Sequence, residues 1–425
     1  MTPGMLLLYI TSYFGLYTSV LFLLSFFQNK HHLSAPPPRR FPSVTIAVPA
    51  FNEQRTIAAT LKSLLELDYP RAKLRVVVVD DGSTDGTYAI AEKFCSAVPA
   101  PFISLIRKEK NSGKADSLNR ALRMCNTELF GALDADSFVH SSSLKKMVGF
   151  FDDPQIMAVT PSLKIYQPAT FWQKIQSVEY LLGVYLRKVF AYFGSIHVTP
   201  GPFTIFRKSF FDRHGLYDEH NLTEDIEVAL RIQSKHYRIQ NTIDASVWTV
   251  GPRTFRALVH QRRRWYVGFL NNVLNYKELF SAKHGNLGLF ILPGAFVSIF
   301  LAIILLGYVG FKMANHFITF VHNLYAINFD ILPWLQFHFD SFFITIDPLT
   351  ILAIIALCSG IFVVWLAKKH SGEQRRISSS YLLYLFVYWI VFAVWWCIAF
   401  HAKAFRKHVT WGKATQPTVP TTQTL

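Results

Sequence analysis

Two aspartates in the segment DADS, Asp134 and Asp136, are spaced so that both can hold one cation. They follow the apolar run ELFGAL, which predicts a buried strand, and residues two apart on an extended strand point to the same side. Carboxylate oxygens are ligands that suit Mg²⁺ or Mn²⁺ bridging phosphates. A solvated turn would have the same composition, so the pair alone predicts either a metal site or a loop.

A second acidic pair, Glu224 and Asp225, stands at the start of the amphipathic segment LTEDIEVALRIQ. Carboxylates in the first turn of a helix stabilise it through the helix dipole, which is an ordinary structural role. In a cleft, one of them would instead act as a general base. The pattern by itself leaves both roles open.

The stretch QRRRWYVGFL, which begins at Gln261, combines three arginines with a tryptophan. A basic helix on a membrane surface is one interpretation. Helical periodicity places four residues on one stripe, namely Gln261, Arg264, Trp265 and Gly268. An arginine can bind a diphosphate bidentately, an indole can stack on a sugar and a glycine leaves room, so this stripe predicts a substrate site. Arg262 and Arg263 face elsewhere and suit the membrane-surface role, so Arg262→Lys is expected to be mild.

Strands and helices alternate along the middle of the chain and position these residues. The runs SVTIAVPAFNE and LRVVVVDDGSTDGT each end in polar residues, and FISLIRKEKNSGKADSLNRALRM adds a strand, a loop and a helix. Buried strands with helical crossovers predict a parallel α/β sheet, which binds ligands at the carboxyl ends of its strands. The loop DDGSTDGT lacks the P-loop signature, so phosphate binding of the ATPase type is not indicated.

Long apolar segments flank this block. Residues 5–27 carry no charge and exceed the about 20 residues that cross a bilayer, and no cleavage site follows them. Residues 287–310, 349–367 and 381–400 are three further predicted spans. The aromatic interval 311–347 contains Asp330 and Asp340, so it is either an external interfacial segment or a poorer additional span.

The net charge of +16 implies an anionic partner. Nucleic acid, lipid headgroups and a phosphorylated substrate all satisfy that requirement. The sequence has neither zinc-ligand spacing nor an aromatic-basic RNA-binding signature, so a nucleic acid partner is not expected. Lipid and a phosphorylated substrate remain.

Six motifs occur in the order PAFNE, DDGSTDGT, NSGKADSLN, DAD, TED and QRRRW, and membrane spans flank them. In this order they resemble the membrane-embedded inverting glycosyltransferases of family 2, which include cellulose, hyaluronan, chitin and poly-N-acetylglucosamine synthases and ceramide glucosyltransferases. The resemblance covers Ser43 to about Gly268 and the membrane arrangement. It implies a GT-A-like (Rossmann-like) domain with a mostly parallel α/β sheet, joined to an α-helical transmembrane region with interfacial helices.

The resemblance also implies roles for individual residues. Asp225 would be the catalytic base, supported by Glu224. The donor nucleotide would be bound by Pro49, Glu53, Asp80, Asp81, Lys114, Asp116, Asp134, Gln261 and Arg264, with Asp80 or Asp81 at the uridine. Asp134 and Asp136 would hold Mg²⁺ or Mn²⁺. The acceptor sugar would contact Gly201, Pro202 and Trp265.

The implied reaction is a single displacement. Asp225 takes a proton from the acceptor hydroxyl, the metal and Arg264 neutralise the departing nucleoside diphosphate, and an α-linked donor gives a β-linked product. The donor would be UDP-GlcNAc or UDP-glucose, and the acceptor a growing polysaccharide that is moved across the membrane. TEDI with QRRRWYVG looks most like poly-N-acetylglucosamine synthases. Two alternatives stay open: an enzyme that adds one sugar to a lipid-linked acceptor, and a catalytically silent membrane scaffold.

The predicted organisation runs from a transmembrane helix at 1–28 through a linker at 29–42 to a GT-A domain at 43–283. Interfacial helices are expected near 168–194 and 254–280, although a buried core helix would also explain 168–194. A transmembrane region at 284–403 and a basic tail at 404–425 complete the chain. The basic linker favours a cytoplasmic catalytic domain on the plasma membrane. The resemblance allows for a small membrane accessory subunit besides the lipid bilayer.

Overall fold

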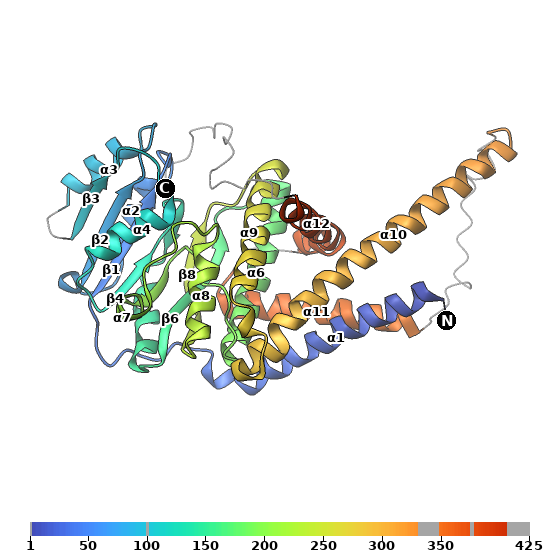
Figure 1. The fold of residues 1–425 in the computed structure, drawn as a ribbon, viewed down its shortest axis with the longest axis horizontal. Coiled ribbons are helices and arrows are strands. Elements are labelled where there is room, and N and C mark those ends of the chain that lie inside the picture. Colours follow the sequence, from blue (N-terminus) through green and yellow to red (C-terminus); the bar gives the residue numbers. More distant parts are fainter. Residues whose placement is uncertain (1, 99–101, 330–347, 375–377, 406–425) are drawn as a thin grey trace.

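The computed structural model describes residues 2–98, 102–329, 348–374 and 378–405. An α/β domain occupies the middle of the chain, and long helices from both ends of the chain extend away from it (Figure 1). The possible additional span at 311–347 is covered only in part, because α10 (Leu292–Ala326) continues through its first half and residues 330–347 lie outside the described residues. The same is true of most of the basic tail.

The central sheet has eight strands in the order β3-β2-β1-β4-β7-β6-β8-β5. Their bounds are β1 Val44–Ala50, β2 Leu74–Asp80, β3 Ile103–Arg107, β4 Leu129–Ala132, β5 Ser137–Val139, β6 Ile156–Ile165, β7 Thr204–Arg207 and β8 Arg238–Thr249. The pairs formed by β1 to β4 are parallel, as is β6 with β8, whereas β7 pairs antiparallel with both neighbours and β5 antiparallel with β8. The sheet is therefore mixed, with its parallel half at the amino-terminal side.

Helices cover both faces of this sheet. One face packs against α2 (Ile57–Leu65) and α5 (Ser143–Val148), and the other against α4 (Lys114–Arg123), α7 (Lys208–His214) and α8 (Glu224–Ser234). A further helix, α3 (Thr87–Ser96), connects β2 to β3. Burial from both sides explains why the strand VTIAVPA shows no alternation of apolar and polar residues.

Four described helices are long and apolar enough to cross a membrane. They are α1 (Pro3–Gln28), the helix Leu287–Ala326 that contains α10, α11 (Pro348–Ser371) and, within α12 (Ser378–Ala404), the segment Leu383–Ala404. α10 diverges from α1 and α11, which run close together (Figure 1).

Two helices lie between the sheet and these long helices: α6 (Phe171–Tyr192) and α9 (Phe255–Asn275). α6 packs on β6 and β8 and also on α1, α11 and α12, while α9 packs on α12. Leu181, Tyr185 and Val189 of α6 form a cluster with Phe26 of α1 and Leu366 of α11. Because α6 has apolar contacts on both sides, it suits the interfacial position expected for it, and the same holds for α9.

Candidate active site

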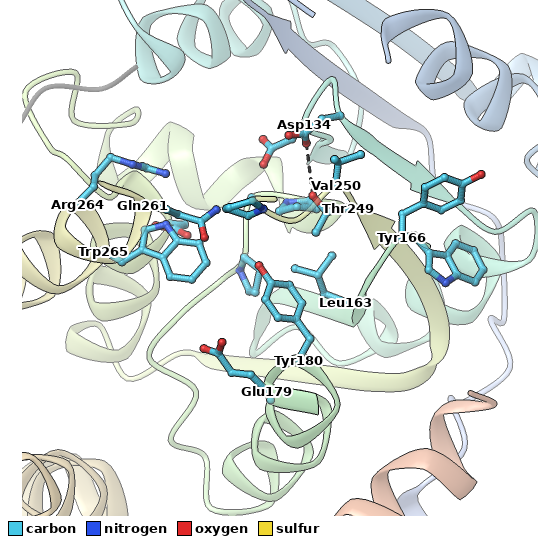
Figure 2. Close-up of a pocket in the computed structure, with 18 of the residues that line it drawn as sticks. Asp134, Leu163, Tyr166, Glu179, Tyr180, Thr249, Val250, Gln261, Arg264 and Trp265 are labelled. Atoms are coloured by element: carbon cyan, nitrogen blue, oxygen red, sulfur yellow. Dashed lines mark hydrogen bonds between the residues drawn. The ribbon is translucent and has the colours of Figure 1, made fainter. Parts of the chain in front are cut away.

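A cavity of about 2100 Å³ joins the ends of the strands to the long helices. Its walls include Pro49 at the end of β1 and the start of α8. The loop after β4 and faces of α6 and α9 also line it, as Figure 2 shows for Asp134, Glu179 and Trp265. Ala295, Ser298 and Ile299 of α10 line the same cavity, as do residues of α12. A single continuous space therefore reaches from the sheet to helices that can cross a membrane.

The register of the sheet brings the predicted site residues together. Ala50 of β1 lies opposite Asp80 of β2, and Ala47 lies opposite Ala132 of β4, so the loops that follow these parallel strands meet at one edge. Asp134 and Asp136 stand in the loop directly after β4. The sequence motifs that are far apart along the chain converge there because parallel strands share a carboxyl edge.

Lys114, the first residue of α4, connects the two acidic pairs. Its Nζ lies 2.7 Å from Asp134 Oδ1 and 3.0 Å from Glu224 Oε1. Burial lowers the pKa of Lys114, but the attractions of Asp134 and Glu224 outweigh burial and raise the pKa above its usual value. Gly201 makes this approach possible, because a Cβ there would overlap Lys114 Nζ and lie 3.2 Å from Asp134 Oδ2.

Asp225 differs from its neighbour in electrostatic environment. Burial and then repulsion by Glu224 raise the pKa of Asp225 to about 6, against the opposing attraction of Lys114 and Arg264. Lys114 and Arg264 hold the pKa of Glu224 below its ordinary value despite burial. A carboxylate whose pKa is close to neutral is suited to accept a proton, whereas Glu224 is suited to remain ionised.

Asp134 and Asp136 have the oxygen donors that a hard divalent cation requires. Both line the cavity, and Ser137 Oγ and Thr249 Oγ1 donate to Asp136 Oδ1 over 3.2 Å and 3.4 Å. Burial and the nearby Asp136 raise the pKa of Asp134 in spite of Lys114, so the chain's own cation only partly offsets this pair of negative charges. Among the described residues, no group of three or more His, Cys, Asp or Glu side chains is placed so that it could hold a metal ion by itself. Two carboxylates fit a magnesium-type site in which phosphate oxygens complete the shell.

Three of the expected donor-binding residues do not line the cavity: Asp80, Asp81 and Asp116. Asp81 is ion-paired with Lys108 and accepts the backbone N–H groups of Ser112 and Gly113 at 3.0 Å and 2.9 Å, so it holds the loop that leads into α4. Asp116 pairs with the same Lys108 at 2.5 Å. Both oxygens of Asp80 are buried without a hydrogen-bond partner in the described part of the chain, so the protein does not use this carboxylate as it uses that of Asp81.

Three of the four residues of the stripe predicted on α9 line the cavity. Gln261, Arg264 and Trp265 project into the cavity across from Asp134 (Figure 2). Gly268 makes room for protein, not for a ligand, because a Cβ there would overlap the side chain of Thr223, just before α8.

The prediction for the other two arginines of α9 is wrong. Arg262 is only 2% exposed and pairs with Glu179 of α6, and Arg263 lines the cavity. Arg262 lies beside the stripe and three residues before Trp265, and a helical pattern cannot show that another helix covers this side. No outward basic face therefore exists at this point of α9.

An aromatic lining on α12 was not anticipated. The residues spaced four apart on this helix all line the cavity: Tyr384, Tyr388, Phe392 and Trp396. Tyr266 of α9 stacks on Trp396 with ring centroids 4.3 Å apart. The spacing of four is visible in the sequence, where it marks one face of a helix. Within a predicted membrane span, an aromatic face of this kind could equally contact lipid, so the spacing alone does not indicate a cavity wall.

Residues 45–215 match the family model described as glycosyl transferase family 2. The poly-beta-1,6-N-acetyl-D-glucosamine synthase of Staphylococcus epidermidis is 28% identical over 377 residues, which cover 87% of this chain and 86% of the relative. The enzyme of the same name from Staphylococcus aureus strain COL is 32% identical over 228 residues, 53% of this chain and 54% of the relative. A solved mannosyltransferase from Pyrobaculum calidifontis, in complex with GDP-Man and Mn²⁺, has a TM-score of 0.56 at 20% identity and covers 94% of this chain and 99% of its own.

The fold and the matched domain define a glycosyltransferase with a family 2 domain of the GT-A type, followed by helices apolar enough for membrane spans. Among proteins of that class, it resembles the poly-β-1,6-N-acetyl-D-glucosamine synthases along most of its length. The alternative of a catalytically silent scaffold is therefore set aside, and the expected fold class is confirmed.

Proposed function

We propose that this protein is a membrane glycosyltransferase that moves a sugar from a UDP-sugar to the end of a growing β-linked polysaccharide, with inversion. The observation that carries the proposal is the continuous cavity, which joins Asp134, Asp136 and Asp225 to Trp265 and then to α10 and α12. A glycosyltransferase that released a small soluble product would not require a cavity extending among membrane helices. The names of the relatives support N-acetylglucosamine as the sugar, and UDP-GlcNAc is therefore the first donor to test.

In this proposal the donor diphosphate lies between the loop after β4 and α9. A divalent cation held by Asp134 and Asp136 would offset negative charge on the departing diphosphate. Arg264 faces the same space and presents a planar fork of N–H donors that fits two phosphate oxygens. Asp80, which has unpaired oxygens, is assigned to the uridine. The ion pair between Lys114 and Glu224 keeps Glu224 ionised.

Asp225 acts as the general base. Its carboxylate takes the proton of the acceptor hydroxyl as that oxygen attacks the anomeric carbon, and the bond to the diphosphate breaks on the opposite face. One displacement of this kind inverts the configuration, so no covalent sugar-enzyme intermediate forms. Trp265, seated across the cavity, holds the terminal sugar of the acceptor through its indole face.

The product would leave through the part of the cavity that α10 and α12 line. Aromatic side chains at intervals of four on α12 present flat apolar faces, on which sugar rings can stack while they move. This arrangement supports elongation coupled to passage across the plasma membrane, with the catalytic domain on the cytoplasmic side. A small membrane subunit and the surrounding lipids are the further partners that we propose.

The test is to reconstitute the purified protein in lipid vesicles, supply Mn²⁺ or Mg²⁺ with UDP-GlcNAc or UDP-glucose in separate reactions, and size the products. A long polymer from one donor supports the proposal. A lipid that carries one sugar would favour the alternative of a glycolipid synthase, and UDP-sugar consumption with neither product would contradict both.

A further inference from the structure

A largely buried charge pair lies beside the proposed acceptor site, and one of its members, Glu179, also lines the cavity (Figure 2). Arg262 Nη2 of α9 lies 2.7 Å from Glu179 Oε2 of α6, and the two side chains are 3% and 17% exposed. Trp395 of α12 lies beside the same guanidinium, with its ring centre 5.5 Å from the central carbon of Arg262. Three helices therefore meet at this pair, and one of them is a predicted membrane span.

The guanidinium of Arg262 also covers one side of Trp265. Its central carbon lies 4.4 Å from the centre of the Trp265 ring and 5.5 Å from that of Trp395 on α12. Arg262 and Trp265 are three residues apart on α9, so they are neighbours on the helix surface. Trp265 lines the cavity and Arg262 does not. The Trp265 indole therefore contacts the Arg262 guanidinium and also borders the cavity.

The stability of the fold does not by itself account for such a pair. Removing two charges from water costs about as much as their attraction returns, and apolar residues of similar volume often stabilise a protein equally well. A guanidinium over the face of an indole attracts the ring, and its planar fork can pair with a carboxylate at the same time, which neither an apolar side chain nor an ammonium reproduces.

We propose that Arg262, held by Glu179, is a positioning residue that fixes the indole of Trp265 for the acceptor sugar. The inference rests on the proposed function, because it assumes that Trp265 contacts the acceptor. Arg262 has no contact with the reacting atoms. Arg262 acts through the orientation of the Trp265 indole. A change at Arg262 therefore affects how well the acceptor sugar is bound and positioned, and it does not affect binding of the donor.

The experiment compares Arg262→Lys with the charge-reversed pair Glu179→Arg plus Arg262→Glu in lipid vesicles. The lysine keeps the charge but cannot stack as a plane. The reversed pair can restore the attraction between α6 and α9, yet it removes the guanidinium from the face of Trp265. Arg256→Lys, at an exposed position on the same helix, is the matched control, and Trp265→Ala shows the effect of losing the indole altogether.

Three quantities are measured: UDP affinity by calorimetry, the KM for a β-linked N-acetylglucosamine oligosaccharide, and product length. Both Arg262 variants should bind UDP within about 2-fold of wild type while acceptor-dependent kcat/KM falls about 10- to 10²-fold, as expected for a misplaced substrate. Wild-type elongation in Arg262→Lys, or its recovery in the reversed pair, would show that the charges only tie two helices together.

If the reversed pair does not fold, Arg262→Lys decides alone, since it preserves both the charge and the Glu179 partner. The wild-type protein in the same vesicles tests the proposed function. The ratio of each variant to wild type tests the inference, so a failure of either is recognised separately.

Discussion

At the level of single residues, the strongest contrast is between two adjacent carboxylates in the first turn of α8. We expect Asp225→Asn to reduce transfer by about 10² to 10⁴-fold or more, because the amide keeps the shape of the side chain but cannot accept the proton. UDP affinity should remain within a few-fold, since Asp225 is not a proposed ligand of the nucleotide. Turnover in this variant near the wild-type rate would exclude Asp225 as the base.

The same contrast predicts a pH dependence. Asp225 must be ionised to act as a base, and burial with repulsion by Glu224 raises its pKa to about 6. Acceptor kcat/KM should therefore be level above that pH and fall as the pH drops below about 6. In Glu224→Gln the repulsion is gone, so the pKa of Asp225 should decrease and the acidic limb should move to lower pH. If the acidic limb of kcat/KM in Glu224→Gln stays at the wild-type pH, a group other than Asp225 controls the loss of activity at low pH.

Asp134 and Asp136 lead to a prediction about metal removal. Chelation should abolish transfer, and Mn²⁺ or Mg²⁺ should restore it, because the two carboxylates leave the remaining ligands to the phosphates of the donor. Asp136→Asn should raise the Mn²⁺ concentration required for half-maximal activity. Ser137→Ala is a useful comparison, since it removes only a hydrogen bond to Asp136 and should have a smaller effect. Full activity in a chelated preparation would remove the metal from the mechanism.

At the level of elements, the packing of α9 on the start of α8 depends on Gly268. A methyl group there would overlap the side chain of Thr223, its Cβ 2.9 Å from Thr223 Cβ, so one helix must move. Gly268→Ala should cost about 1–3 kcal/mol of stability and lower activity, because the displaced turn carries Asp225. Thermal unfolding in detergent and the transfer rate measure the two effects.

The control for this prediction is Gly307→Ala on α10, where an added Cβ meets no atom within 4 Å. It should leave activity unchanged and stability the same or slightly higher, as alanine is the better helix former. Equal behaviour of the two alanine variants would indicate that α9 accommodates the methyl group without moving Asp225.

The elements also show what the sequence was able to predict. The strands, their buried character and the polar residues at their carboxyl ends are local properties, and Asp134 and Asp136 follow β4 as the pattern indicated, although they stand in a loop and not on the extended strand. The burial of Arg262 was missed because it depends on Glu179, which is 83 positions away on another helix. Periodicity describes the faces of one helix and carries no information about what covers them. The same limit applies to Gly268, whose neighbour is Thr223 and not a ligand.

For the molecule as a whole, the decisive feature is that one cavity connects the catalytic loops to helices that can cross a membrane. α10 contributes Ala295, and the aromatic residues of α12 face the same space. A domain that only docked on a membrane would close its active site with its own residues. Here helices that are long and apolar enough to cross a membrane complete the wall, which is why the α/β domain and the long helices are expected to function as one unit.

A bulky side chain on the α10 side of the cavity should therefore impair elongation of the polymer without impairing donor binding. Ala295→Trp places an indole in the cavity beside Ser298 and Ile299, and it should shorten the polymer several-fold while UDP affinity stays at the wild-type value, because the proposed donor residues belong to the loops of the sheet and to α9, not to α10. Val297→Trp adds the same group on the exposed side of α10, where the valine is 43% exposed, and product length should not change. Sizing the products of both variants in one vesicle preparation makes the comparison. Polymer of full length from Ala295→Trp would mean that the chain grows along a different route.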